Sequence, residues 1–391
     1  MKKQTTLGLE NLIIDPPEYF YNERLGLLCN PASVDSKFNH ALNLINKKFP
    51  GQLKALFSPQ HGFYAEKQDN MIESDHIIDP QLKIPVYSLY SETRIPVRAM
   101  FEDIDILLVD IQDVGTRVYT FIYTISYCLE LAAKLKKKVV ILDRPNPIGG
   151  NQIEGNILSN NYTSFVGRFP IPMRHGMTVG EISQFFNKEF NIGCDLKIIP
   201  MSAWKREMYW QDTGLVWVPP SPNLPAPQSA MVYPGQVIFE GTNISEGRGT
   251  TLPFEQFGAP FLDIEKIKYE ADELIKGATL RPVNFEPVSG KWQNEVCKGF
   301  QIHITDREIF TPFLSSLILM QLIIKYHKTK FKLKQPPYEY EFKKMPMDLI
   351  LGSKTVRKKI VDLENLISLS GLWKKELDQF KSISKEYYLY E

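Results

Sequence analysis

The first 150 residues alternate short apolar runs with a helical pattern, and this alternation restricts the fold more than any other feature of the chain. The runs are nearly continuous in apolar residues and are bounded by polar residues, Pro or Gly, as are strands buried on both faces of a parallel sheet. Between the last two runs, apolar residues recur every three or four positions, which indicates an amphipathic helix. Strand, helix and strand in this order form a βαβ unit, so we predict a Rossmann-like, mostly parallel α/β sheet. The predicted strands are Leu25–Cys29, Leu53–Phe57, Val86–Leu89, Ile104–Val109 and Val139–Leu142.

The pattern changes after the fifth run, and we place a domain boundary there. Residues 1–155 form the predicted Rossmann-like domain, and residues 156–391 form a second, smaller α/β domain. Within the second, residues 217–261 are loop-rich, and a segment of that length inside a compact domain is usually functional. The chain then turns Lys- and Glu-rich, which predicts a helical C-terminal extension packed on the second domain. Regular elements in this half are predicted at Leu196–Ile199, Ile264–Ile275, Leu280–Phe285, Gly299–Ile304 and Phe313–Tyr326.

The charge balance restricts the partners. The chain carries 46 Lys and Arg against 45 Asp and Glu, a net charge of +1, and 43% of its residues are hydrophobic. A protein that binds nucleic acid or an anionic membrane surface shows a clear basic excess, so neither partner is expected. No apolar stretch approaches the roughly 18 residues that a membrane span needs. The predicted partner is a small molecule.

The compartment is predicted from the N-terminus and the cysteines. The first residues include two lysines but no apolar segment of the kind that signal peptides contain, which favours the cytoplasm. If a leader had been removed, the periplasm or the exterior would follow instead. The four cysteines lie far apart in the sequence, so reduced thiols are expected.

Polar residues stand directly after each predicted strand. In an open α/β sheet these positions line the crevice at the carboxyl edge, where ligands bind. The alternative is that polar residues follow strands only because strands end in loops. The five residues are Asn30, His61, Glu92, Asp110 and Asp143.

Several common site motifs are missing from the sequence. No GxGxxG follows the first strand and no GxxxxGK[ST] occurs, which disfavours dinucleotide and P-loop chemistry. The six histidines show no HxH or HExxH spacing, and no GxSxG nucleophile elbow is present. We therefore predict no cofactor and no metal.

What remains is a group of carboxylates in turn-rich motifs. Glycoside hydrolysis needs two carboxyl groups on either side of the scissile bond, one as acid and one as base, nucleophile or cation stabiliser. The alternative is that nearby arginines, Arg94, Arg117, Arg144 and Arg248, make structural ion pairs with them. The carboxylates are Glu92, Asp110, Asp113, Asp143, Glu240 and Glu246.

At these motifs the sequence resembles the exo-β-N-acetylmuramidases of the NamZ/YbbC-like group, bacterial glycoside hydrolases that act on peptidoglycan fragments. The matching runs occur in order between about Leu25 and Phe261, and they include LGLLCNPAS, FSPQHGF, YSLYSETRIP, LLVDIQDVGTRVYTFIYT, ILDRPNPIGG, RHGMTVGE, VPPSPNLP and EGTNISEGRGTTLPFEQFGAPF. The resemblance implies two α/β domains with a cleft between them. It also implies removal of terminal β-linked N-acetylmuramic acid (MurNAc) from the non-reducing end of MurNAc–GlcNAc chains, in cell-wall turnover or recycling.

By the same resemblance, Glu92 in the SETR run is the first choice for the catalytic acid/base. Asp110, Asp113 and Glu246, from the group of carboxylates in turn-rich motifs, are further catalytic candidates. The lactyl carboxylate of MurNAc calls for a guanidinium, which Arg94, Arg117 or Arg248 could supply. The other expected substrate contacts are Asn30, His61, Gln112, Tyr119, Asp143, Arg144, Asn146, His175, Asn223, Glu240 and Asn243.

Two other functions fit parts of the pattern. A non-catalytic saccharide-binding protein would keep the aromatic residues and arginines but need no carboxylate with a perturbed pKa. An esterase or amidase on the same fragments is disfavoured by the missing nucleophile elbow and zinc motif.

Overall fold

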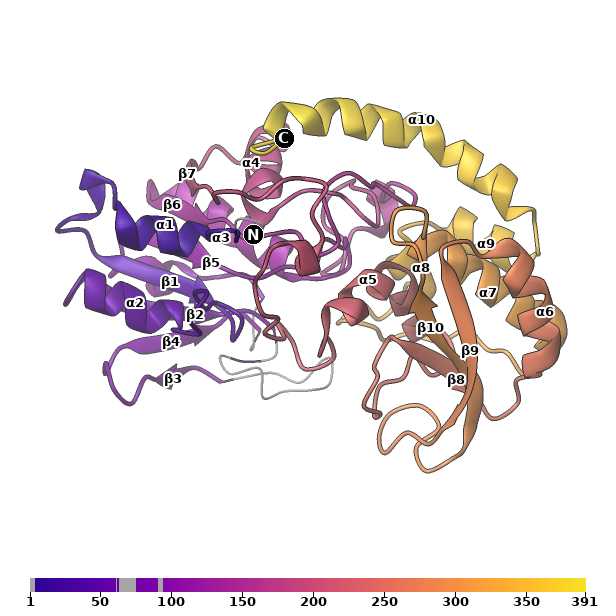
Figure 1. Cartoon of the computed structure of the whole chain (residues 1–391). Helices are drawn as coiled ribbons and strands as arrows, with labels where there is room; N and C mark the ends of the chain where they lie inside the picture. The colour runs from indigo at the N-terminus through magenta and orange to yellow at the C-terminus, as the bar shows by residue number, and fades with distance from the viewer. Residues whose placement is uncertain (1–3, 61, 63–74, 91–93) are drawn as a thin grey trace.

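The structure is a computed structural model that describes residues 4–60, 62, 75–90 and 94–391. In these ranges, the chain forms a seven-stranded sheet and a three-stranded sheet (Figure 1). The larger sheet contains β1 (Leu25–Cys29), β2 (Leu53–Ser58), β3 (Ile77–Ile78), β4 (Pro85–Ser88), β5 (Ile106–Asp110), β6 (Lys138–Leu142) and β7 (Asp195–Ile199).

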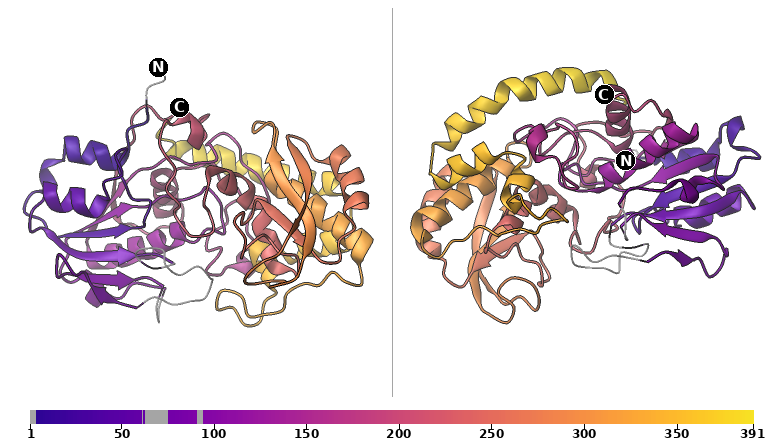
Figure 2. Two further views of the ribbon diagram at one scale, coloured as in Figure 1. Left: turned by 60° about the horizontal axis from the view of Figure 1, so that its bottom comes forward. Right: turned by 180° about the vertical axis from the view of Figure 1, so that it is seen from behind.

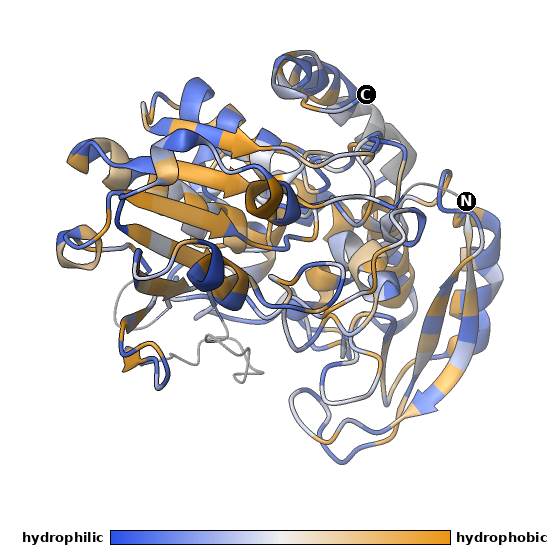
Figure 3. Cartoon of the chain, turned by 60° about the vertical axis from the view of Figure 1, so that its left-hand side comes forward, coloured by the Kyte–Doolittle hydropathy of each residue, from blue (hydrophilic) through white to orange (hydrophobic). Residues whose placement is uncertain are grey.

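The larger sheet has the Rossmann strand order. Its strands lie in the order β3-β4-β2-β1-β5-β6-β7, and all neighbours are parallel except the β3–β4 pair. Its central strands are hydrophobic along their length, as the apolar runs predicted (Figure 3). The predicted fold class is confirmed. The order reverses between β1 and β5, which makes the carboxyl ends of these two strands the topological switch point.

Helices cover both faces of this sheet. The helices α1 (Gly8–Ile14) and α2 (Ala41–Lys48) pack with strand residues such as Leu27 on one face. On the other face, α3 (Phe121–Leu135) packs with residues such as Leu28, the neighbour whose side chain points the opposite way. The further helix α4 (Val179–Glu189) packs beside α3.

The second unit is built around the three-stranded antiparallel sheet. Its order is β8 (Gln256–Ala259), β10 (Cys297–Ile304) and β9 (Ala278–Phe285). Its helices are α5 (Pro227–Gln236), α6 (Ile264–Leu274), α7 (Pro312–His327), α8 (Pro346–Leu351) and α9 (Lys354–Val361). Among the described residues, no helix combines the length and the apolar character needed to cross a bilayer.

The structure corrects the predicted boundary, because the strand β7 pairs with β6 and the first sheet continues well past residue 155. The segment 217–261 lies mostly outside helices and strands, as predicted, but it contains α5, the 3-10 helix Val237–Gly241 and β8, which the sequence did not predict. The reason is that α5 is buried from Ser229 to Gln236 and contains Pro234, so it shows no amphipathic period that a sequence could reveal.

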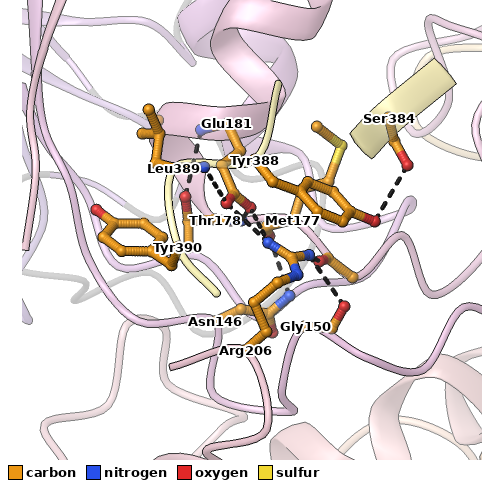
Figure 4. A network of polar contacts seen from close by, with 12 residues as sticks. Asn146, Gly150, Met177, Thr178, Glu181, Arg206, Ser384, Tyr388, Leu389 and Tyr390 are labelled. Atoms are coloured by element: carbon orange, nitrogen blue, oxygen red, sulfur yellow. Dashed lines mark hydrogen bonds and ion pairs between the residues drawn. The ribbon is translucent and has the colours of Figure 1, made fainter. Parts of the chain in front are cut away.

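The C-terminal extension does not pack only on the second unit. The helix α10 (Leu366–Ser384) starts there, where Trp373 contacts Phe313 of α7, and arches back to the first unit (Figures 1 and 2). The last residues bind the first unit, where the Leu389 amide donates to Glu181 at 2.9 Å. Figure 4 shows Arg206 between the Glu181 carboxylate and the Gly150 carbonyl, beneath the Tyr388 ring. The extension therefore ties the two units together.

Candidate active site

A pocket lies between the carboxyl edge of the large sheet and the second unit. Its cavity volume is about 40 Å³. The first unit contributes residues near the end of β2 and the start of α3, including Gln60, Tyr119 and Thr120. The middle and end of the chain contribute Ser221, Asn223, Tyr233, Glu240, Arg248, Phe254, Tyr338 and Glu339. Four of the predicted substrate contacts therefore line one pocket: Tyr119, Asn223, Glu240 and Arg248.

Arg248 lies between two carboxylates at the wall of this pocket. Its Nη2 donates to Glu240 at 2.8 Å, and its Nε is 3.5 Å from Glu246. Among the described residues, its Nη1 has no hydrogen-bond partner. Because one edge of the guanidinium is held by carboxylates, the remaining N–H groups are fixed in direction and available to an anion.

Glu246 is an ion-pair partner rather than a lining residue of the pocket. Its carboxylate lies 2.6 Å from Lys291 Nζ. Burial by itself would raise the pKa of Glu246, but the charges of Lys291 and Arg248 outweigh it and lower that pKa. The predicted catalytic role is therefore not supported by this geometry, which has Glu246 holding Arg248 in place.

Glu339 is a pocket residue that the sequence analysis missed. One of its oxygens accepts a hydrogen bond from the Tyr90 hydroxyl at 2.8 Å, across 249 positions of sequence. Only 4% of Glu339 is exposed, and burial raises its pKa to about 7. The adjacent Tyr338 hydroxyl donates to Glu240 at 2.7 Å. Glu339 and Tyr340 have φ values of 45° and 64°, so the chain turns sharply here and both Tyr338 and Glu339 line the pocket.

Two predicted residues, Glu92 and His61, lie outside the described residues, but their neighbours are at the pocket. Gln60 lines it and accepts a hydrogen bond from the Thr120 hydroxyl at 2.8 Å. Tyr90 contacts Glu339, and the Arg94 guanidinium lies 3.2 Å from the centre of the Tyr340 ring. The roles of Glu92 and His61 remain predictions.

Residues at the switch point bind one another and stabilise the edge of the sheet. Arg144 makes a two-point ion pair with Asp110, with distances of 2.5 and 2.8 Å, and both side chains are almost fully buried. Asn30 donates to the Gln112 carbonyl at 3.2 Å, and the Gln112 amide donates to the carbonyls of Asp113 and Pro145. None of these four predicted residues, Asn30, Asp110, Gln112 and Arg144, lines the pocket. The alternative of structural ion pairs holds for Asp110 and Arg144.

Asp143 and Asn146 also serve the fold. The Asp143 carboxylate accepts four hydrogen bonds, from the amides of Arg144 and Gly180 and the hydroxyls of Thr178 and Tyr390, at 2.6–3.0 Å. With four donors its lone pairs are filled, which leaves none for a sugar. Asn146 donates to the Met177 carbonyl and accepts from the Ile148 amide. The structure therefore contradicts the substrate-binding role predicted for both.

Asp113 and His175 form a buried pair away from the pocket lining. Asp113 Oδ2 lies 4.0 Å from His175 Nε2 and accepts a hydrogen bond from the Gly115 amide at 2.7 Å. Burial raises the pKa of Asp113 to about 7 and lowers that of His175 to about 3, which disfavours the charged form of each. Both predicted roles place these residues against the substrate, whereas neither residue lines the pocket.

Arg117 and Asn243 are bonded to backbone. The Arg117 guanidinium is fully buried and donates to four carbonyls, two of them on α8, at 2.7–3.1 Å. Asn243 donates to the Lys330 carbonyl and accepts from the Lys332 amide, both at 2.9 Å. These bonds give Arg117 and Asn243 structural roles, and neither residue lines the pocket. The four carbonyls belong to Asn156, Ile171, Ile350 and Leu351.

We expect Arg117→Met to lower the free energy of unfolding by about 3–5 kcal/mol, since several buried carbonyls lose their charged donor. Methionine keeps most of the side-chain volume, so the loss reports the hydrogen bonds rather than a cavity. Urea unfolding measures it, with Arg98→Met at an exposed arginine as the control. Equal stability of the two variants would show that Arg117 does not join the units.

The described residues offer no group of three or more His, Cys, Asp or Glu side chains placed to hold a metal ion. The chemistry that this pocket supports is that of two carboxyl groups and an arginine, Glu240, Glu339 and Arg248. That set suits acid–base cleavage of a bond in an anionic substrate.

Comparisons with known proteins identify the family. Residues 25–228 match the family described as "Exo-beta-N-acetylmuramidase NamZ, N-terminal", and residues 231–390 match "Exo-beta-N-acetylmuramidase NamZ, C-terminal". The chain belongs to the NamZ exo-β-N-acetylmuramidase family. It is 40% identical over 391 residues, 100% of this chain and 92% of the other, to the peptidoglycan β-N-acetylmuramidase NamZ of Bacillus subtilis (strain 168).

Two crystal structures of DUF1343 family proteins from Bacteroides fragilis NCTC 9343 share the fold. One is 33% identical with a TM-score of 0.89, and 99% of each chain is covered. The other is 30% identical with a TM-score of 0.74, covering 100% of this chain and 99% of that one. Membership in the NamZ family makes this chain a glycosidase and confirms the resemblance seen in its motifs. It also disfavours both alternatives, the saccharide-binding protein and the esterase or amidase.

Proposed function

We propose that this glycosidase removes terminal β-linked MurNAc from the non-reducing end of MurNAc–GlcNAc chains in cell-wall turnover, and that it does so in the pocket between the two units. The relative from Bacillus subtilis, a peptidoglycan β-N-acetylmuramidase, supports the substrate class. The observation that carries the proposal is the joint presence of Glu240, Glu339 and Arg248 in one pocket. The carboxyl groups can act as acid and base, and the arginine can bind the lactyl carboxylate of MurNAc.

The lining of the pocket suits a sugar ligand. The rings of Tyr119, Tyr233 and Phe254 line it, with Tyr233 and Phe254 packed edge to face at 4.8 Å. Flat rings suit the apolar face of a sugar.

Arg248 is the arginine best placed to bind the lactyl carboxylate. Arg117 donates to four backbone carbonyls, and the Arg94 guanidinium lies over the Tyr340 ring and does not line the pocket. Arg248 faces the pocket with N–H groups whose direction its two carboxylate partners fix. A second anion on such a guanidinium is bound through charge-assisted hydrogen bonds, which are roughly twice as strong as neutral ones.

Product analysis tests the proposal. Incubation with a MurNAc–GlcNAc disaccharide should release free MurNAc and GlcNAc, and a GlcNAc–MurNAc disaccharide should remain uncut. We expect Asn223→Ala, in the pocket, to lower kcat/KM by about 10–100-fold through loss of a hydrogen bond at a buried site. Lys374→Ala, in the groove beneath α10, is the matched control and should leave kcat/KM unchanged. Cleavage of the GlcNAc-terminated sugar at a similar rate would contradict the proposal.

A further inference from the structure

Glu339 is a carboxyl group in the pocket to which the sequence motifs assign no role. It lies in the Lys- and Glu-rich C-terminal part of the chain, beyond the matched motifs, yet it faces the first unit across the pocket. The Tyr90 hydroxyl holds one of its oxygens at 2.8 Å. Within the described residues, its second oxygen accepts no hydrogen bond, and a carboxylate can accept on both oxygens.

The surroundings of Glu339 are suited to proton transfer. Among the described residues, the charged and titratable groups that interact with it are Tyr90, Arg94, Tyr233, Glu240, Arg248 and Tyr338. Burial is the largest influence on its pKa and raises it, Glu240 raises it further, and the Tyr90 hydrogen bond and the two arginines lower it. The result, a pKa of about 7, is where a general base works most efficiently at neutral pH.

We propose that Glu339 is the second catalytic carboxyl group of this enzyme, the general base that takes a proton from the water attacking C1 of the terminal sugar. This rests on the proposed function of the pocket. Glu240 lines the same pocket, but its oxygens are bound by Arg248 and the Tyr338 hydroxyl. Glu339 makes no ion pair within 4 Å among the described residues, so it is the pocket carboxylate better able to accept a proton.

The reaction balances with two carboxyl groups. The acid, Glu92 by resemblance, gives its proton to the glycosidic oxygen as the C1–O bond breaks, and that oxygen leaves with the bonding electron pair as a hydroxyl of GlcNAc. The water oxygen forms the new bond to C1, and Glu339 takes the proton that this water loses. Transfer of that proton through solvent restores both groups. Because water attacks from the face opposite the leaving group, the first product is the α-anomer of MurNAc.

The experiment compares Glu339→Gln with wild type on two substrates, an activated aryl MurNAc glycoside and a MurNAc–GlcNAc disaccharide. Loss of a general base should lower kcat by about 10²–10⁴ on both, with KM nearly unchanged. Glu339→Asp should restore part of the rate. Glu341→Gln, two residues along and outside the pocket lining, is the control, because its carboxylate only accepts from the backbone amides of Lys343 and Lys344.

Two further readouts separate catalysis from structure. Wild-type kcat/KM should fall below about pH 7, because the base must be ionised. The Tyr90→Phe variant loses a hydrogen bond that lowers the pKa of Glu339. The pH below which its kcat/KM falls should therefore be about one unit higher than in wild type. Proton NMR of the first product should show the α-anomer. Wild-type-like turnover by Glu339→Gln, a rise in KM alone, a loss confined to the disaccharide, or a β-anomer would each overturn the proposal.

Failure of the proposed function gives a different result. If wild type cleaves GlcNAc glycosides and not MurNAc glycosides, the substrate assignment is wrong, and the Glu339 variants are then compared on the GlcNAc substrate with the same criteria. A wild-type protein that cleaves neither sugar overturns both proposals.

Discussion

Replacing Arg248 with alanine is expected to remove most of the preference of this enzyme for MurNAc over GlcNAc glycosides. The two sugars differ by the lactyl ether, whose carboxylate we place on Arg248. A site whose donors bind that anion leaves these donors unpaired when GlcNAc binds. Such sites discriminate against an analogue without the expected polar group by a factor of about 10⁴–10⁵ in kcat/KM. The activity of the variant on MurNAc glycosides should fall by a factor of about 10²–10³, and its activity on GlcNAc glycosides should change little.

The measurement uses matched chromogenic MurNAc and GlcNAc glycosides. Because Arg248→Ala leaves Glu240 and Glu246 without a shared cation, the charge-conserving Arg248→Lys is assayed beside it, and thermal unfolding confirms that both fold. Lysine keeps the charge but not the forked geometry, so we expect an intermediate selectivity. Arg94→Ala is the comparison at the other candidate arginine. Comparable wild-type rates on both sugars, or unchanged selectivity in both Arg248 variants, would show that Arg248 does not bind the lactyl group.

Replacing Glu92 with glutamine is expected to lower kcat by about 10²–10⁴ with normal folding, because general acid catalysis is lost. Glutamine keeps the size of the side chain and cannot donate a proton to the glycosidic oxygen. An aryl glycoside with a good leaving group needs little protonation, so the loss should be largest on the MurNAc–GlcNAc disaccharide. This leaving-group dependence distinguishes Glu92 from the base proposed at Glu339, whose loss should be equal on both substrates.

Glu102→Gln, at an exposed position of the same unit, is the matched control for Glu92→Gln. The two variants are compared by thermal unfolding and by kcat on both substrates. Near wild-type turnover by Glu92→Gln with an intact unfolding transition would remove Glu92 from the acid role. The carboxyl group that donates the proton would then have to be sought among the other residues of the pocket.

Much of the fold follows from local pattern. Strands such as β1 and β6 are short apolar runs that only a sheet covered on both faces can bury, and the amphipathic α3 between β5 and β6 sets their parallel direction. The carboxyl edge also follows, because polar residues come after each strand. Helix α5 was missed because it is buried on all sides and therefore carries no amphipathic period.

Tertiary structure decided which polar residues belong to the site. Asp110, Asp143 and Arg117 stand in the right motifs, but partners from distant parts of the chain, such as Tyr390 and the carbonyls of α8, bind them fully. Sequence spacing cannot distinguish a carboxylate whose lone pairs are filled from one that faces a pocket. Glu339 is the opposite case, because it sits in no motif and yet lines the pocket, where it accepts a hydrogen bond from Tyr90. The sheet, its carboxyl edge and the family can be predicted from the chain, since apolar period and motif order are local properties. The set of side chains that meet at the pocket depends on the folded structure, because hydrogen bonds and burial involve residues hundreds of positions apart.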